Sequence, residues 1–119
     1  KEKEDGTAIL TLSEEGKKKI LIYNIDNLKL KKDKNWDGYW RIIIFDIPEK
    51  LKQARYALSK KLQEIGMYQL QKSVYIYPFE CKDELDFIIE YFNLRRYVRF
   101  ILAKEIDNEL HLRKIFDLI

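Results

Sequence analysis

The sequence predicts an α+β domain in which helices cover one face of a four-stranded antiparallel sheet. Short β-branched and aromatic runs alternate with two segments that carry apolar residues every three or four positions. Their order along the chain is strand–helix–strand–strand–helix–strand. The size fits as well, because 119 residues, of which 46% are hydrophobic, can build one compact core but not two.

The beginning of the chain reads as the end of another unit. Thr7–Thr11 is expected to form a short strand, followed by a helix that Ser13 caps and that contains the apolar cluster Ile20–Tyr23. A polar, strongly charged stretch then separates this cluster from the rest. We therefore predict a strand–helix linker segment over residues 1–38 and a regular domain with a C-terminal tail over residues 39–119.

The regular domain divides into elements by periodicity. The run WRIIIFDIPE is β-branched and too short for a helix, so we expect a strand that ends at Pro48. The segment 50–66 has apolar residues at helical spacing and stops at Gly66, which predicts an amphipathic helix. By the same criteria we expect a hairpin of strands within 67–71 and 73–78, a helix over 81–94, a strand within 96–106, and a terminal helix or docked tail over 108–119.

This order of elements is that of the ferredoxin-like fold, in which both helices lie on the same face of the sheet. The other face is then open. A large apolar surface is unfavourable in water, so a partner, the tail or a second copy must cover it. We therefore predict a homodimer.

Composition excludes several classes of function. The formal net charge of only +3 means that any basic surface must be local. One cysteine, Cys81, rules out an intrachain disulfide, and one histidine, His111, rules out multi-histidine metal centres. Glycine-rich phosphate loops and a membrane-length apolar run are also missing from the sequence. We expect a cytoplasmic protein with no cofactor and no membrane partner.

Two runs carry a resemblance to known families. WRIIIFDIPEK and, one helix later, GMYQLQKSVYIYPFEC resemble the central domain of PaaX-type transcriptional repressors and the related small CRISPR-associated adaptation protein, the second of that numbered series. The resemblance extends from Trp40 to about Ile106 and implies a ferredoxin-like core. Its most specific parts are Phe45-Asp46-Ile47-Pro48 and the run that begins at Gln71.

The segment ahead of the first sheet strand decides between the families. PaaX-type repressors begin with a winged-helix DNA-binding domain, and TAILTLSEEGKKKI looks like its last wing strand and the start of a linking helix. This resemblance implies the dimerisation and effector domain of a PaaX-like DNA-binding regulator, with double-stranded DNA and a small-molecule effector as partners. The alternative is a CRISPR-associated protein that works with an integrase, either as a DNA-bridging dimer or as a Mg²⁺-dependent nuclease. A stand-alone ligand sensor is a third, weaker hypothesis.

Asp46 is the one candidate for metal chemistry. In the CRISPR-associated family the matching aspartate is the proposed metal ligand, so the resemblance implies Asp46 as a catalytic residue that binds Mg²⁺ if the protein is an endonuclease. One carboxylate binds Mg²⁺ poorly, but a dimer could bring two copies to a shared axis. The alternative, which we favour, is that Asp46 accepts hydrogen bonds from free N–H groups at the start of the helix after Pro48.

Two groups of basic residues are candidates for nucleic-acid binding. The first group lies on one predicted helix, and the second lies at the entry of the last strand beside Tyr97. The alternatives are a solvated helix face for the first group and pairing with Asp86 and Glu90 for the second. The candidates are Lys50, Lys52, Arg55, Lys60 and Lys61 in the first group, and Arg95, Arg96 and Arg99 in the second.

Overall fold

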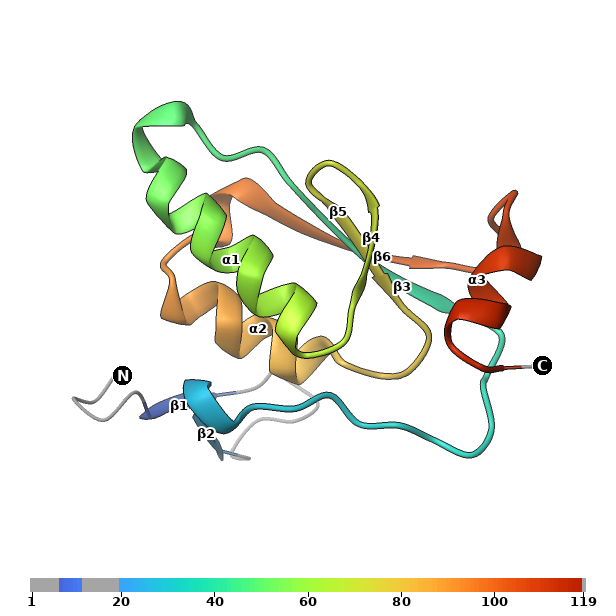
Figure 1. Cartoon of the computed structure of the whole chain (residues 1–119). Coiled ribbons are helices and arrows are strands. Elements are labelled where there is room, and N and C mark those ends of the chain that lie inside the picture. The colour runs from blue at the N-terminus through green and yellow to red at the C-terminus, as the bar shows by residue number, and fades with distance from the viewer. Residues whose placement is uncertain (1–6, 12–19, 119) are drawn as a thin grey trace.

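The predicted α+β architecture is confirmed. The computed structural model describes residues 7–11 and 20–118, and its main body is a four-stranded antiparallel sheet of strand order β4-β5-β3-β6 (Figure 1). This is the ferredoxin-like order, with the first and third strands of the domain side by side in the centre. The strands are β3 at Trp40–Phe45, β4 at Tyr68–Gln71, β5 at Val74–Tyr77 and β6 at Val98–Ala103.

Two helices lie together on one face of this sheet (Figure 1). They are α1 at Lys52–Glu64, entered through a 3-10 turn at Glu49–Leu51, and α2 at Lys82–Tyr91. Two positions after its last residue, each helix is followed by a residue in the left-handed region, Gly66 at φ +109° and Asn93 at φ +58°. Glycine and asparagine reach this conformation at the lowest cost, and both helices therefore stop where they do.

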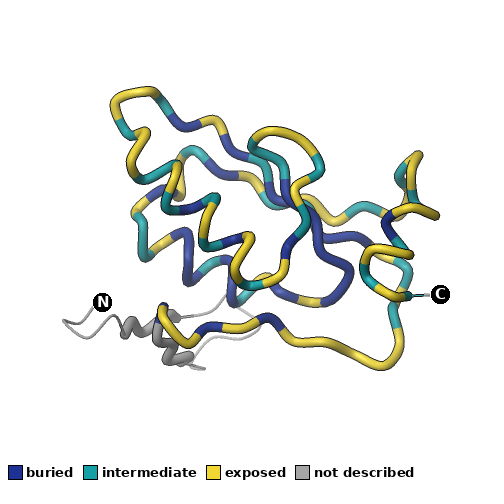
Figure 2. The backbone as a smooth tube through the Cα atoms, in the orientation of Figure 1, coloured by how far each residue is buried: buried dark blue, intermediate teal, exposed yellow. Residues whose placement is uncertain are grey.

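The main core fills the space between these helices and the sheet. Strand residues alternate, so Ile43 and Phe45 of β3 point to the helices together with Tyr75 of β5. They meet Leu58 and Leu62 of α1 and the apolar side of α2, all buried. Figure 2 shows buried residues concentrated in the sheet and along α2. Cys81 belongs to this core, as an apolar helix stripe predicts, and burial raises the pKa of its thiol to about 12.

The opposite face of the sheet is covered only at one end. The terminal helix α3, at Glu109–Ile115, places Leu112 against Trp40 and Ile76, and all three are fully buried (Figure 1). Trp40 Nε1 also donates to Glu109 Oε1 at 3.4 Å. The tail is therefore a helix that docks on the second face, and part of that face stays open.

One element differs from the sequence prediction. Ile20–Asn24 is a strand, β2, which pairs antiparallel with β1 at Thr7–Thr11, so the helix expected over this cluster is wrong. Ser13, its expected cap, lies outside the described residues. The β-branched and aromatic content of ILIYN favours a strand once β1 offers backbone partners. The start of the chain is thus a hairpin beside α2 (Figure 1).

From the hairpin, the chain runs as an extended strap over the helical layer before it enters β3 (Figure 1). Ile25, Leu28 and Leu30 are buried in the main core. Lys61 Nζ donates to the carbonyl of Ile25 at 3.0 Å, and the Tyr77 hydroxyl donates to the carbonyl of Lys31 at 3.0 Å. We call residues 25–36 the strap. In the described residues, no helix is long and apolar enough to cross a membrane.

Candidate nucleic-acid interface

The end of β3 and the entry of β6 form a surface pocket. It is lined both by the candidate metal ligand and by two of the basic residues that are candidates for nucleic-acid binding. Asp46 NH donates to the carbonyl of Tyr97 at 2.9 Å, which fixes the end of one strand against the start of the other. The pocket has a volume of about 390 Å³. It is lined by Ile44, Phe45, Asp46, Arg96, Tyr97 and Arg99.

The arginines enter this pocket from two elements. Arg99 lies on β6 directly opposite Ile44 of β3, so both side chains belong to the sheet face that the helices leave free. Arg96 lies in the 3-10 turn Arg95–Tyr97, and its guanidinium sits 5.5 Å from the centre of the Tyr97 ring. Both arginines are exposed, and in the described part of the chain neither has an ion-pair partner.

Asp46 does not act as the helix cap that we favoured from the sequence. The 3-10 turn that leads into α1 has Pro48 at its cap position and no side-chain cap hydrogen bond. The exposed carboxylate of Asp46 makes no hydrogen bond or ion pair with any described residue. Both its charge and its acceptor positions are therefore available to a partner.

The pocket does not suit a divalent cation within one protomer. Mg²⁺ prefers six oxygen ligands, whereas the pocket offers one carboxylate beside two guanidinium groups that repel cations. Among the described residues there is no group of three or more His, Cys, Asp or Glu that could hold a metal ion. Asp46 is thus a single acid in a basic pocket.

The eight basic candidates separate into two sets. Four have partners inside the protomer: Lys52 and Arg55 approach Glu49 at 3.8 and 3.6 Å, Lys61 meets Glu64 at 3.0 Å, and Arg95 contacts Asp86 and Glu90 at 3.0 and 3.1 Å. The pairing of Arg95 with α2 is the alternative that the sequence offered for the second group. The other four are exposed and have no ion pair with a described residue: Lys50, Lys60, Arg96 and Arg99.

A second hollow brings the two basic groups to one end of the molecule. It has a volume of about 540 Å³ and lies between the start of α1, at Leu51 and Ala54, and the segment 92–97 that follows α2. Arg96 and Tyr97 line both this hollow and the Asp46 pocket. Lys50 precedes Leu51, so free cations from two separate segments gather around this end of the sheet.

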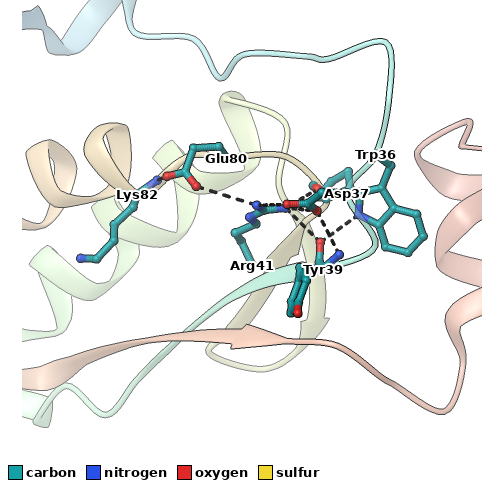
Figure 3. A network of polar contacts seen from close by, with 7 residues as sticks. Trp36, Asp37, Tyr39, Arg41, Glu80 and Lys82 are labelled. Atoms are coloured by element: carbon teal, nitrogen blue, oxygen red, sulfur yellow. Dashed lines mark hydrogen bonds and ion pairs between the residues drawn. The ribbon is translucent and has the colours of Figure 1, made fainter.

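Arg41 was missed by the sequence reasoning and is the most buried charged side chain of the described residues after Glu84. Its guanidinium donates to both carboxylate oxygens of Asp37, at 2.9 and 2.7 Å, and to the carbonyl of Pro78 at 2.8 Å (Figure 3). Glu80 approaches at 3.8 Å. Figure 3 shows these partners around one end of β3. The signal was available, because an arginine inside the otherwise apolar WRIIIF run requires buried acceptors.

Glu84, near the start of α2, is a second buried charge. It is only 3% exposed, and its nearest cation is Lys31 of the strap at 4.0 Å. Burial raises the pKa of this carboxyl, an effect that Lys31 partly opposes. Glu84 and Arg41 both contact the segment that precedes β3, and they hold that segment in place rather than forming a site.

The fold agrees with the comparison to known families. The family described as PaaX protein central Cas2-like domain matches residues 33–114, which is more than half of the chain and includes all four strands of the main sheet. No curated protein and no solved structure matches the chain significantly. The sequence resemblance is confirmed, and the chain belongs to the PaaX central Cas2-like domain family.

Proposed function

We propose that this chain is the homodimerising domain of a PaaX-like DNA-binding transcriptional regulator. The observation that carries the proposal is the half-covered second face of the sheet. Where α3 does not reach, that face presents apolar strand residues to solvent. We call it the uncovered face, and it consists of Ile44, Val74 and Ile101 together with Ile42, which at its border also packs against the cluster of Trp40, Ile76 and Leu112.

The uncovered face has the character of an interface. The register places Ile42 of β3 directly opposite Ile101 of the edge strand β6, and Ile44 opposite Val74 of β5. Ile101 is 40% exposed, and the other three are half-buried within a contiguous apolar surface. A contiguous apolar surface of this kind marks a site of association, and a second copy of the same face is self-complementary.

The start of the chain supports the regulatory role. A winged helix ends in a two-stranded wing, and β1 and β2 form an antiparallel pair ahead of the strap. In such regulators the reading of bases belongs to the winged helix, and a dimer places two readers on two half-sites. The free cations Lys50, Lys60 and Arg96 would then contribute secondary, sequence-independent contacts to the phosphate backbone.

Sedimentation equilibrium tests this proposal directly. The wild-type chain should sediment as a dimer in the micromolar range, and Ile101→Glu should sediment as a monomer with an unchanged far-ultraviolet circular dichroism spectrum. Tyr56→Glu is the matched control, because Tyr56 is 57% exposed on α1, which lies on the other side of the sheet, and should leave the dimer intact. A wild-type chain that remains monomeric at high micromolar concentration would contradict the proposal.

A further inference from the structure

Two unpaired groups of opposite charge lie at the border of the uncovered face. Asp46 follows β3 two residues after Ile44, and Arg99 is the β6 residue directly opposite Ile44. Both line the same pocket with Ile44, and both are exposed. An acid and a base that share a pocket but form no ion pair with each other or with another described residue are available to charges on another molecule.

Charged residues of the turn before β6 and of α2 do pair within the protomer. Arg95, four residues before Arg99, contacts two acids of α2 at 3.0 and 3.1 Å. Lys82 and Asp86 also pair on that helix, at 3.3 Å. Asp46 and Arg99, which have no ion pair with a described residue, lie beside the sheet face that lacks a covering element.

Twofold symmetry turns this arrangement into a complementary surface. A twofold axis in the interface plane, midway between Asp46 and Arg99 and perpendicular to the line that joins them, places each residue opposite the other type on the partner. The ion pair then forms twice. The opposite arrangement would place the two Asp46 carboxylates against each other, which costs free energy unless a cation intervenes. Arg96 and Arg99 make the pocket unfavourable for that cation.

We infer that Asp46 forms an ion pair with Arg99 of the partner subunit, and that the two symmetric pairs set the orientation of the dimer. The inference rests on the proposed dimerisation through the uncovered face. Ile44 adjoins both charged residues, two positions before Asp46 along the chain and directly opposite Arg99 on β6, and packs near the axis. Asp46 and Arg99 are then both residues of the subunit interface. Arg99 contacts the partner subunit and does not bind nucleic acid.

Charge reversal separates this arrangement from its alternatives. Asp46→Arg and Arg99→Asp should each raise the dimer dissociation constant, measured by sedimentation equilibrium, by about tenfold or more, because each creates two like-charge contacts. The double variant Asp46→Arg/Arg99→Asp should return to within about threefold of the wild type, because the pair is restored with its charges exchanged. Neither side chain pairs with another described residue, so all three variants should keep the circular dichroism spectrum and melting temperature of the wild type.

Two further variants complete the test. Lys60→Asp reverses an exposed, unpaired charge on α1 and should leave the dissociation constant unchanged. Asp46→Asn should weaken the dimer, with or without Mg²⁺, whereas a metal shared by two Asp46 residues would give a dimer that Mg²⁺ strengthens and a chelator weakens. If the wild type dimerises but the double variant is as weak as the two single changes combined, the ion pair is wrong and the dimer stands. A monomeric wild type would overturn both proposals.

Discussion

Arg41 holds Asp37 by two parallel hydrogen bonds of 2.9 and 2.7 Å, and thereby fastens the residues that precede the sheet to its central strand. The same guanidinium reaches the carbonyl of Pro78 beyond β5 at 2.8 Å. Its Nε has no hydrogen-bond partner although it is buried. A single side chain therefore joins three segments at one end of the sheet.

Asp37→Ala should lower the free energy of unfolding at neutral pH by about 1–3 kcal/mol, because a buried guanidinium loses its bidentate acceptor. The hydrogen bonds from Arg41 hold the pKa of Asp37 below its usual value. The stabilisation is therefore fully present above the pKa of the unfolded chain and is lost as the pH falls through the lower folded pKa. Urea unfolding of both proteins across this acidic range checks the prediction, and a constant difference down to strong acid would contradict it.

Leu112→Ala should destabilise the domain by about 2–4 kcal/mol, since the leucine is fully buried against Trp40 and Ile76. It should also shift tryptophan emission to the red, because loss of α3 packing admits water to Trp40. Leu110→Ala is the matched control on the same helix, where the side chain is 64% exposed and the change should stay within about 0.5 kcal/mol. Equal effects of the two substitutions would show that α3 does not dock as described.

Binding to double-stranded DNA should be weak, independent of sequence and reduced by salt. Lys50→Gln and Lys60→Gln should each reduce the salt dependence of affinity by about one unit of slope, because these lysines have no partner among the described residues. Lys52→Gln and Lys61→Gln should have smaller effects, since both lysines already pair with glutamates. Fluorescence anisotropy at several salt concentrations measures the slope for each variant. Larger changes in slope for Lys52→Gln and Lys61→Gln than for Lys50→Gln and Lys60→Gln would show that the unpaired lysines do not contact DNA.

The wild-type chain should leave DNA and RNA uncut in the presence of Mg²⁺ or Mn²⁺. Asp46 stands beside two arginines, and a single carboxylate supplies too few ligands for a catalytic divalent ion. Gel analysis of labelled substrates checks this outcome. Cleavage by the wild type that disappears in Asp46→Ala would establish the nuclease alternative.

The regular part of the fold could be predicted from local patterns. The short β-branched and aromatic runs WRIIIF and SVYIYP predicted strands, and the apolar spacing from Leu51 to Ile65 predicted α1. The tail was predicted only as a helix or a docked segment, because its place depends on what the sheet leaves uncovered.

The failures have a common physical origin in contacts between distant segments. Ile20–Asn24 forms a strand instead of the helix predicted after Ser13, because its backbone N–H and C=O groups pair with those of β1. Local propensity takes no account of such pairing with a distant segment. Similarly, the basic sequence of α1 could not show that Lys52 and Arg55 share Glu49 as a partner while Lys60 has none. The pocket around Asp46 combines residues about 50 positions apart, which no spacing rule detects.

The strap gives the molecule a stiffness that a flexible tether would not provide. Three buried side chains and two hydrogen bonds to carbonyl oxygens clamp it, at Ile25, Leu28, Leu30 and Lys31. A DNA-reading unit joined ahead of Ile25 would move together with the sheet as one rigid body. In a dimer, the distance between the two DNA-reading units would then be nearly constant. Adding or deleting a base pair between the two half-sites of the operator should therefore reduce binding sharply.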